Sequence, residues 1–370
     1  MAKLAQTPPM GWNTWNTFCW NIDEALIRET ADIMASEGYL DAGYDTLVLD
    51  DAWMARQRDS DGNLTADPVK FPGGMKNLID YVHSKGLKFG LYSDSGTQTC
   101  AGFPGSFGNE RRDANLFASW GVDFLKYDGC YMTPGSNAEV LYRRMGQALR
   151  ESGRDILYSA CYSADGVWTW MKKTGAHMWR IAGDIADSWE SIEKVGFGAV
   201  GIGSYSGPGG WNDLDMLVVG VDGKGWVGEI GKGSTVTEYQ THFALWCIMG
   251  SPLMMGNDLR KASPEIKNIL LNKDLIAINQ DKACVPATRV PGYAEVFAKP
   301  LSDGRIAFGL FNRNKDRRSL ALSWDYSGWE ITDSVALYDA IAHRELGVYS
   351  GSATFPVEGH GCRVIIGKRM

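Results

Sequence analysis

The stretch F-L-K-Y-D-G-C-Y, residues 124–131, holds the pattern that decides the fold. It begins as a short apolar strand and ends by presenting Lys126, Asp128 and Cys130 in quick succession. An aspartate at the end of one strand is commonly a turn former. The same ending recurs after other apolar runs of this chain, and the recurrence predicts a shared site at one edge of a sheet.

Short apolar runs alternate with helical segments from about residue 7 to residue 260. In one helical segment Met75, Leu78 and Val82 share a face, which is the spacing of an amphipathic helix. Gly86 ends that segment and an apolar run follows it. The runs expected to form strands span residues 46–49, 87–92, 122–128, 156–161, 177–180, 213–216 and 252–255.

This alternation implies βαβ units and a parallel sheet, which places the chain in the α/β class. About eight such units fit a (β/α)8 TIM barrel, which we expect over residues 1–282, and an open doubly wound sheet is the second alternative. From residue 283 to residue 370 the pattern changes to short strands separated by Gly, Asp and Asn turns, which predicts a C-terminal antiparallel β-sandwich domain. Its expected strands span residues 290–300, 305–312, 318–324, 334–338 and 363–367.

Polar and aromatic residues follow the predicted strands of the barrel. Functional groups gather at the carboxyl ends of the strands in both parallel folds. Carboxylates that follow five separate strands indicate a site rather than five unrelated turns. The candidates are Trp15, Asp50, Asp51, Tyr92, Lys126, Asp128, Cys161, Arg180, Asp184 and Asp215.

Composition excludes several classes of partner. The net charge is −7 and basic residues never run longer than a pair, which argues against nucleic acid or an anionic membrane. No apolar stretch reaches transmembrane length. The opening M-A-K-L-A-Q-T-P-P lacks the apolar core of a signal peptide, so we expect either a cytoplasmic protein or a secreted one whose signal has been removed.

The cysteines and histidines do not form a metal-binding pattern. The seven cysteines contain no C-x-x-C, and the five histidines are isolated. We therefore expect no metal and no other cofactor. Gly223–Gly228 matches G-x-G-x-x-G, but further glycines stand at 231 and 233, where a nucleotide-binding helix should begin, so a flexible loop is the better interpretation.

A cluster of carboxylates with aromatics, one arginine and one lysine suits glycoside chemistry. A retaining glycosidase needs two carboxyl groups about 5 Å apart, one as nucleophile and one as acid and then base. Lys126, two residues before Asp128 on the same strand face, would keep Asp128 ionised. The acid/base is expected to have the higher pKa. The same carboxylates at successive strand ends would also suit a magnesium-dependent barrel enzyme, which is the alternative.

Six ordered motifs resemble the α-galactosidases of glycoside hydrolase family 27. The resemblance covers almost the whole predicted barrel, and a similar β domain follows. The motifs are P-P-M-G-W-N-T-W at 8–15, L-D-D-A-W-M at 49–54, C-A-G-F-P-G-S-F-G at 100–108, L-K-Y-D-G-C-Y at 125–131, W-R-I-A-G-D-I at 179–185 and G-G-W-N-D-L-D-M-L at 209–217.

The resemblance implies a metal-free retaining mechanism with Asp128 as nucleophile and Asp184 as acid/base, held near Arg180. It further implies that Asp50 and Asp51 bind O4 and O6 of galactose. The other implied substrate contacts are stacking by Trp15, a wall from Tyr92, a contact from Lys126, and contacts near O2 from Cys161 and Asp215.

Two places depart from a simple match. Cys100 and Cys130 correspond to a family pair that forms a disulfide beside the pocket, and we expect the bond in an exported or oxidised protein. After the fifth strand the family often has C-E-W or E-W, whereas this chain reads Ala160-Cys161-Tyr162-Ser163. Recognition at C2 of the sugar therefore depends on residues that differ from the usual pair.

The sequence thus predicts a retaining exo-α-galactosidase that acts on terminal α-linked galactose. A β-L-arabinopyranosidase or an α-N-acetylgalactosaminidase of the same family is the alternative, and a sugar-binding protein without catalysis is a third. The sequence leaves the oligomeric state open, with a homo-oligomer among the alternatives.

Overall fold

The computed structural model describes residues 4–225, 233–324 and 328–370 of the chain. The last three residues of the glycine-rich motif at 223–228 lie outside these ranges. No helix in the described part is both long and apolar enough to cross a membrane.

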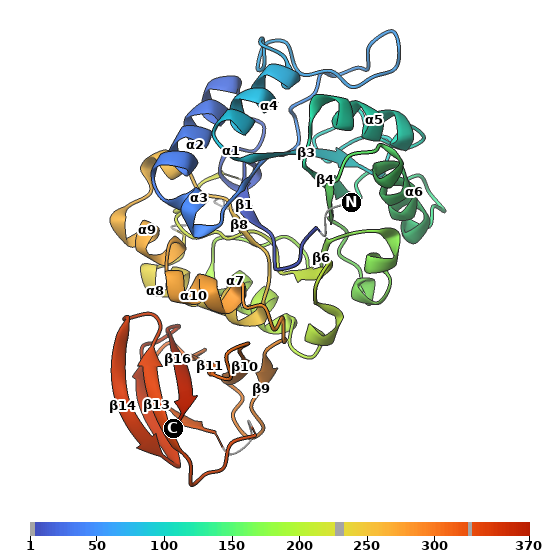
Figure 1. Cartoon of the computed structure of the whole chain (residues 1–370). Coiled ribbons are helices and arrows are strands. Elements are labelled where there is room, and N and C mark those ends of the chain that lie inside the picture. Colours follow the sequence, from blue (N-terminus) through green and yellow to red (C-terminus); the bar gives the residue numbers. More distant parts are fainter. Residues whose placement is uncertain (1–3, 226–232, 325–327) are drawn as a thin grey trace.

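The first sheet is a ring of parallel strands surrounded by helices (Figure 1). Each strand pairs with its sequence neighbour, and β1 also pairs with β8. A parallel bridge between Leu217 and Met255 completes the circle between β7 and β8. The strands are β1 (Met10–Asn13), β2 (Thr46–Leu49), β3 (Lys88–Asp94), β4 (Phe124–Asp128), β5 (Leu157–Ala160), β6 (Met178–Arg180), β7 (Trp211–Asp213) and β8 (Leu253–Met255).

This strand order confirms the predicted (β/α)8 barrel and excludes the doubly wound alternative, because such a sheet places strands out of sequence order. The strand expected at 213–216 lies earlier in the chain than predicted, because β7 ends at Asp213. Both faces of the barrel strands are largely buried, because one face packs in the barrel interior and the other against the helices.

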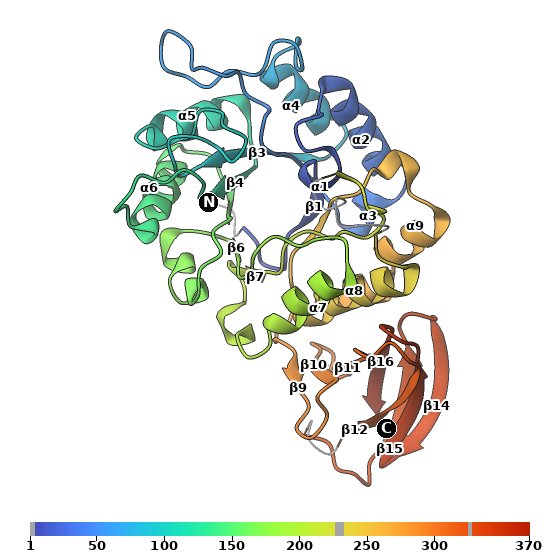
Figure 2. The ribbon, with the colours of Figure 1, turned by 180° about the vertical axis from the view of Figure 1, so that it is seen from behind.

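Helices follow most strands and form the outer ring seen from both sides (Figures 1 and 2). Local capping fixes several of their starts: Asp23 accepts a hydrogen bond from the backbone of Leu26, and Thr235 with Glu238 forms a capping box. The helices are α1 (Trp15–Phe18), α2 (Glu24–Ser36), α3 (Tyr39–Ala42), α4 (Met75–Ser84), α5 (Glu110–Trp120), α6 (Ala138–Glu151), α7 (Trp189–Gly198), α8 (Val236–Met249), α9 (Pro264–Leu270) and α10 (Lys273–Asn279).

The connection after β5 differs from the others. Instead of an α-helix it contains two 3-10 turns, Val167–Thr169 and Met171–Thr174. Gly166 and Gly175 border these turns in the left-handed conformation, which ends any longer helix.

The C-terminal sheet is antiparallel throughout and forms a sandwich with a separate two-stranded layer, β12 and β15. Its larger layer has the order β14-β13-β16-β11-β10-β9. The strands are β9 (Thr288–Arg289), β10 (Val296–Pro300), β11 (Ile306–Phe311), β12 (Arg318–Ser323), β13 (Ser334–Asp339), β14 (Arg344–Ser350), β15 (Ser352–Val357) and β16 (Cys362–Arg369). The predicted β-sandwich is confirmed, although β9, β14 and β15 were not among the expected strands.

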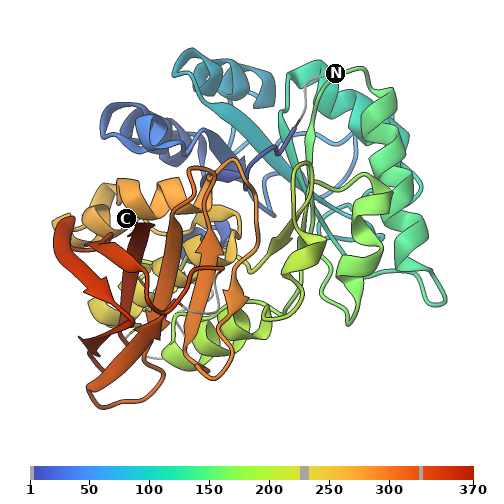
Figure 3. The ribbon, with the colours of Figure 1, turned by 60° about the horizontal axis from the view of Figure 1, so that its bottom comes forward.

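The sandwich packs against the side of the barrel formed by α7, α8 and α10 (Figures 1 and 3). Phe311 of β11 lies fully buried at this boundary, with its ring centroid 5.8 Å from that of Phe197 in α7. The ring of His360 stacks on Trp189 at 4.3 Å, and the His360 carbonyl accepts a hydrogen bond from Thr241 of α8. Because α8 is covered by the barrel on one side and by the sandwich on the other, its residues 241–248 are all buried.

We expect Phe311→Ala to lower the free energy of unfolding by about 3–5 kcal/mol, because it leaves a cavity between barrel and sandwich. Urea unfolding followed by circular dichroism measures this. Val348→Ala in β14, where the residue is 59% exposed, is the matched control and should change the value by less than about 0.5 kcal/mol. Equal urea midpoints for the two variants would show that packing of Phe311 at the boundary does not contribute to the free energy of unfolding.

Candidate active site

A single cavity brings together the residues that follow the barrel strands. Every predicted site residue lines it except Cys130, which is linked to the lining residue Cys100. The predicted residues that line it are Trp15, Asp50, Asp51, Tyr92, Cys100, Lys126, Asp128, Cys161, Arg180, Asp184 and Asp215. The cavity is also lined by residues that sequence reasoning missed, namely Asn16, Trp20, Ala101, Ile185 and Met216.

Strand register explains why side chains from β3 and β4 meet. Tyr92 stands opposite Lys126 in the ladder, and Asp94 stands opposite Asp128. Residues two apart on a strand point to the same face. Lys126 and Asp128 therefore project together into the cavity, as the sequence pattern predicts.

The floor of the cavity contains a buried ion pair. The Lys126 ammonium lies 2.8 Å from Oδ2 of Asp50, which also accepts a hydrogen bond from the Asn13 amide at 2.6 Å. Burial acts to lower the pKa of Lys126, but the charge of Asp50 outweighs it and holds that pKa above its usual value. Lys126 therefore stays charged, and its direct partner is Asp50 rather than the expected Asp128.

The neighbouring Asp51 is held by backbone donors. Its carboxylate accepts hydrogen bonds from the N–H groups of Ala52 at 2.6 Å and Ala101 at 2.8 Å. Burial nevertheless raises the pKa of Asp51 to about 6, against the effect of these hydrogen bonds. Asp50 and Asp51 thus present two fixed carboxyl groups at the end of β2.

Asp128 lies beside this pair and is half-buried at the end of β4. One oxygen accepts a hydrogen bond from the Gly129 N–H at 2.9 Å, and the other accepts one from the Tyr92 hydroxyl at 3.2 Å. Burial raises the pKa of Asp128 above its usual value, and the positive charge of Lys126 offsets part of that rise.

Asp184 has a different environment. Its side chain is 66% exposed, while that of its partner Arg180 is buried. The Arg180 guanidinium donates to Asp184 at 3.0 Å and lies 3.2 Å from Asp215. Burial acts to raise the pKa of Asp184, but Arg180 outweighs it and holds that pKa below its usual value. The expectation of a raised pKa at Asp184 is therefore wrong for this arrangement.

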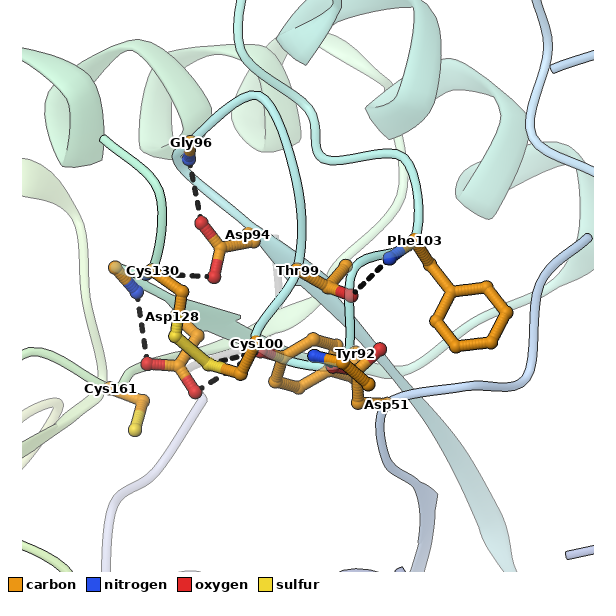
Figure 4. Close-up of a disulfide and its surroundings, with 12 residues drawn as sticks. Asp51, Tyr92, Asp94, Gly96, Thr99, Cys100, Phe103, Asp128, Cys130 and Cys161 are labelled. Atoms are coloured by element: carbon orange, nitrogen blue, oxygen red, sulfur yellow. Dashed lines mark hydrogen bonds between the residues drawn. A yellow bond between two sulfur atoms is a disulfide. The ribbon is translucent and has the colours of Figure 1, made fainter. Parts of the chain in front are cut away.

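The disulfide between Cys100 and Cys130 joins the loops that follow β3 and β4 (Figure 4). The expected bond is thus present. The Tyr92 hydroxyl lies 3.3 Å from the Cys100 sulfur. Gly96 is needed where the loops approach, since a Cβ there would lie 2.1 Å from the Cys130 carbonyl oxygen.

Asp94 supports the same two loops and is a residue that sequence reasoning missed. Its oxygens accept hydrogen bonds from the Gly96 N–H at 2.6 Å and the Cys130 N–H at 2.9 Å (Figure 4). With Cys100, Asp128 and Cys130 it forms a cluster of metal-ligand types. Because the two sulfur atoms are bonded to each other, they are not available as thiolate ligands.

Asp187 is a second buried residue that was missed. Its carboxylate accepts hydrogen bonds from the N–H groups of Gly223 at 2.8 Å and Ser234 at 2.9 Å, and from the Tyr239 hydroxyl at 2.8 Å. Three residues after Asp184, it ties that segment to the connection between β7 and α8. Asp187 lies two residues beyond the motif at 179–185, so the motif did not indicate it, and the sequence gives no sign of the groups it contacts.

The segment after β5 presents one residue to the cavity. Cys161 lines it, with its sulfur 3.6 Å from the Arg180 guanidinium. The ring of Tyr162 instead packs against Tyr142 and Trp170, with centroids 5.7 and 6.3 Å apart. Tyr162 and Ser163 are not among the residues that line the cavity.

Comparison with known proteins agrees with the motif resemblance. Residues 7–281 match the family described as alpha galactosidase A, and residues 291–366 match the alpha galactosidase C-terminal beta sandwich domain. The chain belongs to the α-galactosidase family. It is accordingly a glycoside hydrolase.

Relatives of this α-galactosidase family match over nearly the whole chain. An α-galactosidase of Cyamopsis tetragonoloba is 42% identical over 98% of this chain and 86% of its own length. The structure of α-galactosidase I from Mortierella vinacea has a TM-score of 0.91 at 36% identity and covers 98% of this chain and 97% of that one. The α-galactosidase of Saccharomyces cerevisiae with raffinose has a TM-score of 0.88 at 28% identity, with 99% and 98% covered.

The buried Asp94 predicts a pH dependence of stability. Burial and the nearby charge of Asp128 raise the pKa of Asp94 to about 8, whereas an unfolded aspartate has a pKa of about 3.9. Between these values the folded chain binds more protons than the unfolded chain. The free energy of unfolding therefore falls as pH rises through this window, by up to about 1.4 kcal/mol per pH unit from this group.

Asp94→Asn removes this titration. We expect the wild type to lose stability relative to Asp94→Asn between about pH 5 and pH 8, measured by urea unfolding at several pH values. Only the difference between the two proteins is diagnostic, because other groups titrate in both. Parallel pH profiles would mean that Asp94 is ionised in the fold throughout this range.

Proposed function

We propose that this glycoside hydrolase is a retaining exo-α-galactosidase, with Asp128 as nucleophile and Asp184 as acid/base. The observation that carries the proposal is that one cavity is lined by these two carboxyl groups and by the Asp50–Asp51 pair. The cavity is closed at the strand ends, where Asp50 and Asp51 are each only 1% exposed. Such a blind pocket suits a terminal sugar rather than the middle of a chain.

The proposed reaction has two steps. An oxygen of Asp128 bonds to C1 of galactose while the bond from C1 to the leaving oxygen breaks, and Asp184 gives that oxygen its proton. A water molecule then attacks C1 and gives its proton to Asp184, and the bond to Asp128 breaks. Two inversions at C1 give net retention.

The environments of the two carboxyl groups support these roles in different ways. Lys126 and the hydrogen bonds from Gly129 and Tyr92 favour the ionised form of Asp128, which attacks. Asp184 must hold a proton although Arg180 lowers its pKa. A leaving group seated over its exposed carboxyl would displace water and raise that pKa. Loss of charge from Asp128 in the intermediate then favours ionised Asp184, the base of the second step.

The Asp50–Asp51 pair supports galactose as the sugar. Two adjacent carboxyl groups, both fixed by hydrogen bonds, can accept from two neighbouring hydroxyls such as O4 and O6. Trp15 lines the same cavity and can stack on the apolar face of the ring. The related yeast α-galactosidase was solved with raffinose, an oligosaccharide that suits such a pocket.

Initial hydrolysis rates on three p-nitrophenyl glycosides test the function: the α-galactoside, the α-N-acetylgalactosaminide and the β-L-arabinopyranoside, all with EDTA present. We expect the α-galactoside to be cleaved fastest. A preference for another of the three would keep the mechanism but reassign the sugar. Loss of activity with EDTA would favour a metal-dependent enzyme instead.

Substitution of the two carboxyl groups tests their roles. Asp128→Ala should abolish turnover, and azide should restore it with formation of the inverted glycosyl azide. Asp184→Ala should reduce hydrolysis of a natural oligosaccharide by about 10²–10⁴-fold, with a much smaller loss on p-nitrophenyl α-galactoside, whose leaving group needs no proton. Equal losses of Asp184→Ala on both substrates would contradict the acid assignment.

A further inference from the structure

The side chains that line the cavity are more exposed at its mouth than at its floor. The carboxyl groups of Asp50 and Asp51 are almost completely buried at the ends of the strands. Asp184 and Trp20 line the same cavity, but the Asp184 side chain is 66% exposed and Trp20 is 54% exposed. This exposure places Asp184 and Trp20 at the entrance, where the leaving group of a terminal sugar must lie.

The backbone of Trp20 is held firmly although its ring is exposed. The Lys70 ammonium donates to the carbonyl of Trp20 at 2.9 Å and to that of Ala52 at 3.0 Å. Ala52 directly follows the Asp50–Asp51 pair. The turn after α1 adds a hydrogen bond from the Asn21 N–H to the Phe18 carbonyl at 2.8 Å. Trp20 is thus fixed to the strand end that carries the sugar-binding carboxylates.

No ring of the described residues lies in aromatic contact with the indole of Trp20. Within the described part of the chain, the ring–ring and cation–ring contacts do not include it. An indole exposes a large flat apolar surface, and burying it against a flat partner is favourable. The C–H face of a pyranose ring is such a partner.

We propose that Trp20 forms the stacking surface of a subsite for the sugar ring of the leaving group. This inference rests on the proposed α-galactosidase function and adds to it the chemical class of the group next to galactose. Trp20 binds that ring but does not take part in bond breaking. It makes the enzyme favour glycosidic leaving groups that carry a pyranose ring over small alkyl ones.

Two substrates that share galactose separate this role from effects on the sugar pocket. They are α-galactosyl-(1→6)-glucose, whose leaving group is a pyranose, and methyl α-galactoside, whose leaving group is methanol. Trp20→Ala should lower kcat/KM for the disaccharide by about 3- to 10-fold, the size of one aromatic stacking contact. For methyl α-galactoside it should change kcat/KM by less than about twofold.

Trp20→Phe and Tyr205→Ala are the matched controls. Phenylalanine keeps a flat ring, so Trp20→Phe should retain most of the disaccharide preference. Tyr205 is 42% exposed and does not line the cavity, so Tyr205→Ala should behave as the wild type. Thermal unfolding of each variant reports whether the fold is intact.

The outcomes separate the two proposals. Equal losses on both substrates, or no loss on either, would overturn the leaving-group subsite while the wild-type activity stands. A wild-type enzyme that hydrolyses neither substrate would instead overturn the proposed function, and the subsite with it. A selective loss on the disaccharide in Trp20→Ala, reversed in Trp20→Phe, would establish the stacking role.

Discussion

The ion pair between Lys126 and Asp50 is the interaction on which the site depends. Of the described residues that line the cavity, five carry carboxyl groups and two, Lys126 and Arg180, carry a positive charge. This imbalance in a buried place explains why the pKa values of Asp51 and Asp128 are raised, since burial and like charges both penalise ionisation. Without Lys126 the floor would contain several carboxyl groups with no nearby cation, which is a costly arrangement.

The second positive charge divides the site into two halves. Arg180 lies between Asp184 and Asp215 and lowers the pKa of Asp184. Lys126 forms an ion pair with Asp50, and at longer range its charge acts on Asp128. The two halves come from different parts of the ring of strands, so their spacing depends on barrel closure and on the segments after β6 and β7 that carry Asp184 and Asp215. The disulfide between Cys100 and Cys130 then fixes the loops beside Asp128, which limits the motion of the buried half.

The sequence was sufficient for the barrel and for most of the site because both follow from local patterns. Asp128 ends an apolar strand, and parallel strands carry their carboxyl ends to one face. Local patterns do not predict which distant side chains form a pair. Lys126, for example, pairs with Asp50, which is 76 positions away in the sequence. The strand β14 was missed because it is mostly exposed and lacks apolar alternation, and Pro356 obscured β15.

For the proposed function, the contrast between a buried floor and an exposed mouth would let one pocket recognise the terminal sugar strictly and its leaving group permissively. At the floor, fixed carboxylates accept hydrogen bonds only from correctly placed hydroxyls, and a missing hydroxyl would leave a buried polar group without its partner. At the mouth, Trp20 offers a flat surface on which many rings can lie, because stacking depends little on the pattern of hydroxyls. The same gradient leaves Asp184 exposed at the mouth, which is where the proposed acid/base would meet the departing group and then water. In the proposed function, selectivity for the terminal sugar and tolerance of what it is attached to would both follow from the depth at which each side chain lies.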